Sequence, residues 1–219
     1  MQGRLADLQG LDWTRFLGRR SLVPVLNDAQ AALLGEVWKG AARGCENVIM
    51  LSLGTGVGGA AMLDGQLLRG HLGRAGHLGH ISLDPTGSLD IVNTPGSLEE
   101  AIGECSLRRR TNGRFDSTVA MLALGWNDGA IRAVWLESVR ALARGIASLV
   151  NVLDPEVVVL GGGIVAARER LFEPLHAELD KIEWRPHGKK VRIVPATAGE
   201  FAGALGAAKN AIDHLDRKP

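Results

Sequence analysis

The sequence is short of cysteine, of net charge and of long apolar runs, and each shortage excludes a class of protein. Its two cysteines, Cys45 and Cys105, cannot build a disulfide framework or a cysteine-rich zinc site. Lys and Arg number 25 against 24 Asp and Glu, so the formal charge of +1 predicts no basic surface for nucleic acid or anionic lipid. No run approaches the roughly 18 apolar residues of a membrane span, and residues 1–10 lack a signal-peptide core. We therefore expect a cytoplasmic protein without nucleic-acid or membrane partners.

Glycine, in contrast, is abundant. The chain has 29 glycines in 219 residues, nearly twice the usual frequency of about 7%. Its 46% hydrophobic and 22% charged residues are typical of a folded globular protein. Segments with strand and helix patterns alternate, which predicts α/β layers, and the turn dipeptide Asp64-Gly65 adds a hairpin. The sheet should therefore be mixed rather than purely parallel.

The expected elements follow from apolar spacing. The most regular helical stripe lies in 127–153, and the pattern also predicts helices from Asp28, from Ser97, at 166–182 and at 201–215. Strands are expected at 48–53, 156–160 and 191–194, with a strand end at 23–26 and Asp28 as the cap of the helix after it. Residues 71–96 are rich in Gly, His, Pro and Asp and show little periodicity, so they should form a long loop that carries a site.

Two glycine loops could bind phosphate. Gly54 to Gly59 fits G-x-G-x-x-G, but the residues after it read as a strand, whereas a dinucleotide fingerprint needs a helix there. Gly161-Gly162-Gly163 lies between a strand and a predicted helix, a better context, although no ribose-binding acid ends the next strand. The Thr55 hydroxyl, the amides around it and a helix start at 162–163 could all bind phosphate oxygens. The pair of loops favours a bound nucleotide, with simple tight turns as the alternative.

A carboxylate stands at a strand-to-helix turn. Asp28 follows Asn27 there, so it could take a proton from a substrate hydroxyl that Asn27 orients. Capping of the helix is the alternative role for this Asn-Asp pair.

Three histidines lie in the glycine-rich loop. His71, His77 and His80 are separated by 6 and 3 positions and could bind zinc, but no fourth ligand is evident. Hydrogen bonding to a polyhydroxylated ligand needs fewer coincidences, and solvated loop histidines remain an alternative. Glu99 should interact with the dipole of the helix that begins at Ser97, unless that helix end faces the same cleft.

Six segments in chain order resemble the ROK family, over about residues 8–213. They are NDAQAALLGE, LSLGTGVGGAAMLDGQLLRG, GRAGHLGHI, PGSLEEAIG, LDPEVVVLGGGI and AGEFAGALGAA. The resemblance implies the actin-like ATPase (ribonuclease H-like) fold, a glucokinase-type hexose kinase that uses ATP and Mg²⁺, and a homodimer. An alternative hypothesis, from a different class of enzyme, is a dinucleotide oxidoreductase that binds its cofactor at Gly161 to Ala166.

The resemblance also assigns roles to residues. It implies that Asp28 is the catalytic base and that the sugar contacts are Asn27, His80 and Glu99, with His77 in place of the family's sugar-binding Glu. It further implies that the phosphates lie at Gly54, Thr55 and Gly56 and the adenosine at Gly161, Gly162 and Gly163.

Two departures from the family pattern qualify that picture. The family's C-x-C-x4-C zinc triplet aligns with Asp90, Val92 and Ser97, so no structural zinc is expected and His80 should be free to face the sugar. The family's Asp-x-Gly-Gly-Thr phosphate loop has no counterpart here. We therefore expect a first-lobe remnant at 1–46, a second lobe at 47–200 and a C-terminal helix at 201–219. The alternative function is a catalytically inactive sugar-binding or regulatory protein.

Overall fold

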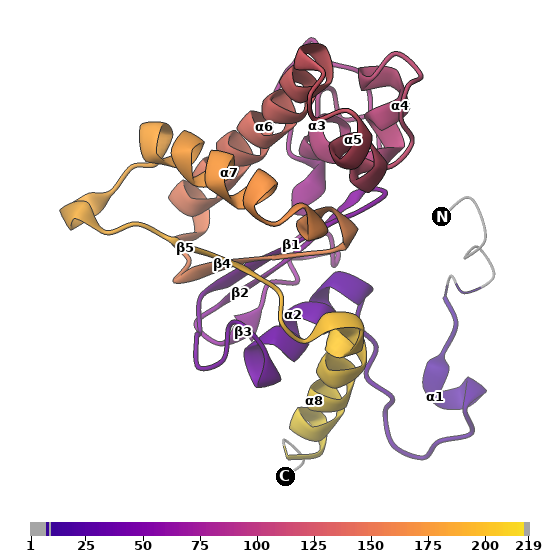
Figure 1. Cartoon of the computed structure of the whole chain (residues 1–219). Coiled ribbons are helices and arrows are strands. Elements are labelled where there is room, and N and C mark those ends of the chain that lie inside the picture. The colour runs from indigo at the N-terminus through magenta and orange to yellow at the C-terminus, as the bar shows by residue number, and fades with distance from the viewer. Residues whose placement is uncertain (1–7, 9, 217–219) are drawn as a thin grey trace.

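A five-stranded mixed sheet forms the centre of the computed structural model, which describes residues 8 and 10–216 (Figure 1). The strand order is β3-β2-β1-β4-β5, and β1 runs antiparallel to β2 but parallel to β4. The strands are β1 (Val48–Leu53), β2 (Val57–Leu63), β3 (Gln66–Leu67), β4 (Val157–Gly161) and β5 (Arg192–Pro195). The predicted mixed α/β sheet is confirmed, while predictions on residues 1–7, 9 and 217–219 lie outside the described residues.

Helices cover both faces of the sheet. In Figure 1, α6 and α7 lie over one face and α2 and α8 over the other, while α1 stands apart from these layers. The helices are α1 (Trp13–Phe16), α2 (Asp28–Lys39), α3 (Leu98–Ile102), α4 (Leu107–Arg110), α5 (Thr118–Leu124), α6 (Gly129–Leu153), α7 (Glu169–Ile182) and α8 (Ala202–Asp216). Within the described residues, none of them combines the length and apolar character that crossing a bilayer requires.

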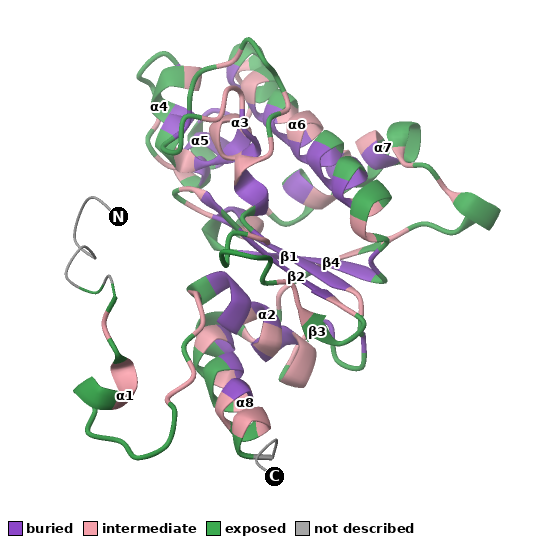
Figure 2. Ribbon diagram, turned by 180° about the vertical axis from the view of Figure 1, so that it is seen from behind, coloured by how far each residue is buried: buried purple, intermediate pink, exposed green. Residues whose placement is uncertain are grey.

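Strand β1 is buried on both faces. Ile49 and Leu51 join the apolar cluster that includes α6 and α7, whereas Val48 and Met50 join the cluster on the α2 side. The split follows from the two-residue period of a strand, which sends successive side chains to opposite faces. A strand with two buried faces therefore appears in the sequence as the continuous apolar run at 48–53. Figure 2 shows the buried residues gathered in the strands and on the helix faces next to them.

The hairpin between β2 and β3 turns at the predicted dipeptide. Asp64 and Gly65 have φ values of 48° and 71°, the left-handed region that a two-residue type I′ turn requires. Met62 then pairs with Leu67. The expected hairpin is confirmed by this register.

Three local predictions differ from the structure, the third only in where the α-helix begins. Residues 23–26 pair with no strand of the described sheet, because β1 has β2 and β4 as its neighbours. The cap of α2 is Asn27, whose side chain accepts a hydrogen bond from the Gln30 amide, and Asp28 is the first helical residue. A 3-10 segment at Gly163–Ala167 precedes α7, so no α-helix starts directly at the second glycine loop.

Helices α2 and α8 approach closely because glycines lie at their contact. A Cβ atom on Gly206 would lie 1.6 Å from the Ala31 carbonyl oxygen, and one on Gly35 would lie 2.1 Å from that of Ala202. Only glycine permits this backbone separation. The contact fixes the start of α8 relative to α2, and both helix starts border the cleft described next. The segment boundaries at 46 and 200 stay predictions.

Candidate functional site

A cleft of about 830 Å³ opens where β1 and β4 end. The crevice outside the carboxyl ends of strands is the usual ligand site of α/β sheets. Most of the predicted site residues line this cleft: Asp28, Gly54, Thr55, Gly56, His77, His80, Glu99, Gly161 and Gly162. Asn27 and Gly163 adjoin the lining residues without being among them. The cleft thus brings the α2 carboxylate and both glycine loops together.

Asp28 presents an exposed carboxylate at the start of α2. Its Oδ1 accepts a hydrogen bond from the Ala29 amide at 2.8 Å, which leaves Oδ2 to face the cleft. The positive end of the helix dipole favours a negative group at this position. Asn27 commits its carboxamide oxygen to the Gln30 amide at 2.7 Å, so its amide nitrogen is the group left to donate to a ligand.

The first glycine loop has a rigid hydrogen-bonded frame. The Gly54 amide donates to the Gly56 carbonyl at 2.9 Å, and the Val57 amide donates to Glu99 Oε2 at 3.0 Å. The Cys105 amide holds the Thr55 carbonyl from behind at 2.8 Å. Among the hydrogen bonds of the described residues, these leave the amides of Thr55 and Gly56 and the Thr55 hydroxyl as donors toward the cleft.

Glu99 lies directly against this loop. A Cβ atom on Gly56 would lie 2.2 Å from Glu99 Oε2, so glycine at this position makes room for the carboxylate. Ser97 caps α3 by accepting a hydrogen bond from the Glu100 amide at 3.3 Å, which places Glu99 in the first turn. Glu99 lies in the first turn of α3 and also lines the cleft, so both positions weighed from the sequence are found together, and its bond to the Val57 amide is a further role that the sequence did not indicate.

The second glycine loop packs against the end of β1. Gly162 has a φ of 88°, and a Cβ atom there would lie 2.3 Å from the Leu53 carbonyl oxygen. No other residue fits this position without strain. The helix start expected at 162–163 is that of a short 3-10 helix, Gly163–Ala167 with Gly162 as its cap residue, and α7 begins only at Glu169.

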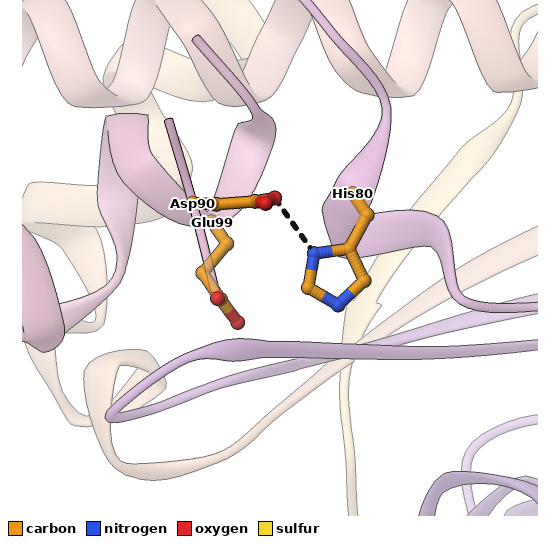
Figure 3. Close-up of side chains that lie close together, drawn as sticks. All are labelled: His80, Asp90 and Glu99. Atoms are coloured by element: carbon orange, nitrogen blue, oxygen red, sulfur yellow. Dashed lines mark hydrogen bonds and ion pairs between the residues drawn. The ribbon is translucent and has the colours of Figure 1, made fainter. Parts of the chain in front are cut away.

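His80 is paired with a buried acid. Its Nδ1 lies 2.8 Å from Asp90 Oδ2, and the Asp90 side chain is fully shielded from solvent (Figure 3). The expectation that His80 is free is therefore wrong for one of its ring nitrogens. Candidate ligand atoms of His80, Asp90 and Glu99 lie within 4.8 Å of one another, so this group, and not the three histidines considered from their spacing, is the cluster in the described residues that could hold a metal.

The charge state of Asp90 follows from its surroundings. Burial alone would raise the pKa of its carboxyl. Hydrogen bonds from the Thr94 amide, His80 and other neighbours outweigh burial, and they hold the pKa below its ordinary value. Asp90 is thus a carboxylate at neutral pH, although it lies in the protein interior.

Glu36 on α2 is a structural acid next to the cleft that no sequence pattern singled out. It is fully buried, and its carboxylate accepts hydrogen bonds from the amides of Thr197 at 3.0 Å, Ala198 at 2.8 Å and Ala41 at 2.7 Å. The segment that it holds continues into cleft-lining residues. A glutamate on the apolar face of the predicted helix was the available signal, because buried acids need partners.

Comparisons with known proteins agree on one family. A model of the ROK family matches residues 19–214. A glucokinase of Thermotoga maritima is 32% identical over 200 residues, covering 83% of this chain and 63% of the relative. The chain spans 63% to 66% of the length of the first curated relatives it matches.

Two solved structures extend the comparison. A ROK hexokinase from Thermus thermophilus has a TM-score of 0.85 at 34% identity, covering 94% of this chain and 69% of that one. A ROK family glucokinase from Streptomyces griseus, in complex with glucose and AMPPNP, has a TM-score of 0.74 at 27% identity, covering 91% and 70%. The fold is the mixed α/β, actin-like ATPase fold of these proteins. Given a family match over residues 19–214 and these likenesses, the chain belongs to the ROK family.

Proposed function

We propose that the protein is an ATP-dependent hexose kinase of glucokinase type. The observation that carries the proposal is a single cleft in which the exposed Asp28 carboxylate shares its walls with the amides of Thr55 and Gly56. A proton acceptor and a set of phosphate-binding donors in one cleft are the parts that phosphoryl transfer to a hydroxyl needs. The relatives described as glucokinases, one of them bound to glucose and AMPPNP, support the same reading.

On the sugar side of the cleft, residues of the chain bind the hexose, orient it and deprotonate its attacking hydroxyl. Asp28 accepts the proton of the attacking hydroxyl on Oδ2, because Oδ1 is already bonded to the Ala29 amide. His80 and Glu99 accept hydrogen bonds from further hydroxyls, and the exposed His77 lies beside His80 to contact the same ligand. The Asn27 amide donates to the sugar or to the Asp28 carboxylate.

On the nucleotide side, the residues fit a triphosphate. The Thr55 hydroxyl and the amides of Thr55 and Gly56 hold phosphate oxygens, while Gly161 and Gly162 form part of the cleft wall. Gly163 adjoins that wall on the predicted adenosine side. When bound, ATP supplies the phosphoryl group, and Mg²⁺ neutralises its charge.

The test is a coupled assay of ADP release over a panel of hexoses. Asp28→Asn keeps the shape of the side chain and removes its basicity, so we expect kcat to fall by about 10²- to 10⁴-fold. Asp128→Asn is the matched control, because Asp128 also accepts backbone hydrogen bonds at a helix start, that of α6, but does not line the cleft. Unchanged turnover in Asp28→Asn would remove the proposed base.

Sugar binding without phosphoryl transfer is the second candidate. It is favoured by the small number of donors, two amides and one hydroxyl, that the first glycine loop leaves for phosphate. Calorimetry that detects hexose binding, with no ADP release in the assay, would select it. The homodimer and the cytoplasmic location stay predictions, and light scattering checks the first.

A further inference from the structure

The loop between His80 and α3 folds back on itself and returns a buried acid to the site. Isolated bridges pair Ser82 with Ser97 and Leu89 with Pro95, so the two arms of the loop run side by side. At its tip, the Asp90 amide bonds to the Thr94 carbonyl at 3.0 Å. The fold of the loop brings the Asp90 side chain next to His80, which lies ten positions earlier in the chain.

The two oxygens of Asp90 do different work. Oδ1 accepts hydrogen bonds from the amides of Val92 and Thr94, both at 2.9 Å, and so holds the loop tip. Oδ2 lies 2.8 Å from His80 Nδ1. A merely structural acid would need only the backbone contacts, whereas the second oxygen is aimed at a cleft-lining side chain.

This pairing fixes which nitrogen of His80 carries the proton. An ionised carboxylate can only accept, so Nδ1 must donate its N–H to Asp90. In the neutral imidazole, Nε2 is then an acceptor with a free lone pair. Figure 3 shows that Nε2 and the Glu99 carboxylate are directed to the same side, away from Asp90. Both groups line the cleft, so they present two acceptors to a ligand.

We propose that Asp90 is a positioning residue for sugar recognition: it binds the Nδ1–H of His80 and thereby holds Nε2 as an acceptor for a ligand hydroxyl. The proposal rests on the proposed function, since hydroxyl donors are what a hexose offers to paired acceptors. In this role the partners of Asp90 are three protein hydrogen bonds, two from amides and one with His80, and the chelator arm of the experiment below separates this role from that of a metal ligand.

The first experiment reads the tautomer directly. Two-dimensional ¹H–¹⁵N spectra of the histidine side chains, recorded at about pH 8 where an ordinary imidazole is neutral, identify the protonated nitrogen. The protein has six histidines, and His80→Gln assigns the His80 signals by their loss. We expect the Nδ1–H form in the unaltered protein. Finding Nε2–H, or a His80 signal that a chelator changes because a metal occupied the cluster, would overturn the proposal without any assay of activity.

The substitution Asp90→Asn should exchange the donor and the acceptor in the hydrogen bond between residue 90 and His80. The Asn carboxamide oxygen can still accept from Val92 and Thr94, so the loop should stay folded, while its NH₂ group now faces Nδ1. The His80 proton should therefore move to Nε2, which turns the cleft-facing nitrogen from an acceptor into a donor. Asp84→Asn is the control: Asp84 is an exposed acid in the same loop, bonded to Thr86 and outside the cleft lining. An unchanged tautomer in Asp90→Asn contradicts the proposal.

Kinetics connect the tautomer to recognition. We expect Asp90→Asn to raise the hexose KM about tenfold, the effect of one lost hydrogen bond to a polar group, with kcat and the ATP KM nearly unchanged. His80→Gln should have a similar effect, and the double variant should be no worse than either single one, since both remove the same contact. Additive effects, or a hexose KM unaffected by Asp90→Asn, would overturn the role.

The outcomes separate this inference from the proposed function. If no hexose is bound or phosphorylated by the unaltered protein, the proposed function fails, and the spectra still report whether Asp90 sets the His80 tautomer. If the unaltered protein is an active kinase but the Asp90→Asn spectra do not change, only the positioning role fails.

Discussion

Glu36 and Asp90 are two buried acids that each hold a different segment bordering the same cleft. Both carboxylate oxygens of Glu36 accept hydrogen bonds from protein amides, those of Thr197, Ala198 and Ala41. Its structural role therefore needs no ligand. Asp90 spends one oxygen on amides and keeps the other for His80. The first acid shapes the cleft, whereas the second also sets the hydrogen-bonding character of a group inside it. Replacing Glu36 should therefore lower the stability of the protein, whereas replacing Asp90 should weaken the binding of a ligand.

The largest effect should come from removing Glu36. Glu36→Ala leaves the amides of Thr197, Ala198 and Ala41 without their acceptor, and a hydrogen bond to a charged group contributes about 1.5–3 kcal/mol. We expect the free energy of unfolding, measured in urea, to fall by at least about 3 kcal/mol. Glu173→Ala, an exposed glutamate on α7, is the matched control and should change it little. Equal losses in both variants would mean that Glu36 does not hold the segment at 197–198.

A second substitution tests whether α2 and α8 must pack closely for Glu36 to hold the segment at 197–198. Gly206→Ala brings a Cβ atom against the Ala31 carbonyl oxygen, so the helices must separate and the free energy of unfolding should fall by about 1–3 kcal/mol. Gly203→Ala on the same helix meets no atom within 4 Å and should stabilise by roughly 0.5–1 kcal/mol, because alanine favours a helix. Opposite signs in urea unfolding are the expected result, and equal signs would show that α8 is not packed as described.

A third acid, Glu99, sharpens the comparison because it resembles both. Like Glu36 it accepts a hydrogen bond from a backbone amide, that of Val57, and like Asp90 it lies close to His80. Gly56→Ala pushes against Glu99 Oε2 and should break this bond, lowering the free energy of unfolding by about 1 kcal/mol. Gly58→Ala, whose Cβ atom would make ordinary contacts at 3.6 Å or more, is the control and should be closer to neutral in thermal unfolding. If Gly58→Ala costs as much, the loss does not come from Glu99.

Sequence reasoning reached the fold because its signals are local. The apolar run at 48–53, the Asp64-Gly65 turn and the stripe in 127–153 each specify an element through neighbours within a few residues. The family resemblance added the order of these elements and the site residues that the cleft brings together. The strand expected at 23–26 failed because an extended segment becomes a strand only beside a partner, and no local pattern supplies one.

The roles of Glu36 and Asp90 could not be predicted either, because they too depend on partners that are distant in the sequence. Glu36 is 161 residues from Thr197, and the role of Asp90 depends on a loop that doubles back before it meets His80. A loop whose sequence has no periodicity does not indicate that its two arms will pair with each other. Their importance lies in hydrogen bonds between segments, which a pattern of residue types along the chain does not encode.

The smallest effect should come from an acid that holds backbone amides at the surface. Glu156 Oε1 accepts hydrogen bonds from the amides of Glu46 at 2.7 Å and Asn47 at 3.0 Å, and these hydrogen bonds lower the pKa of its carboxyl below its ordinary value. A depressed pKa adds stability above the ordinary value and loses it as pH falls through the folded-state value. Glu156→Gln should therefore lower Tm slightly at pH 7, and the difference from the unaltered protein should shrink in acid, below about pH 4. Because the site is exposed, water competes for these donors, so the change should stay well below that of Glu36→Ala. A Tm difference that is the same at every pH would show that the charge of Glu156 contributes nothing.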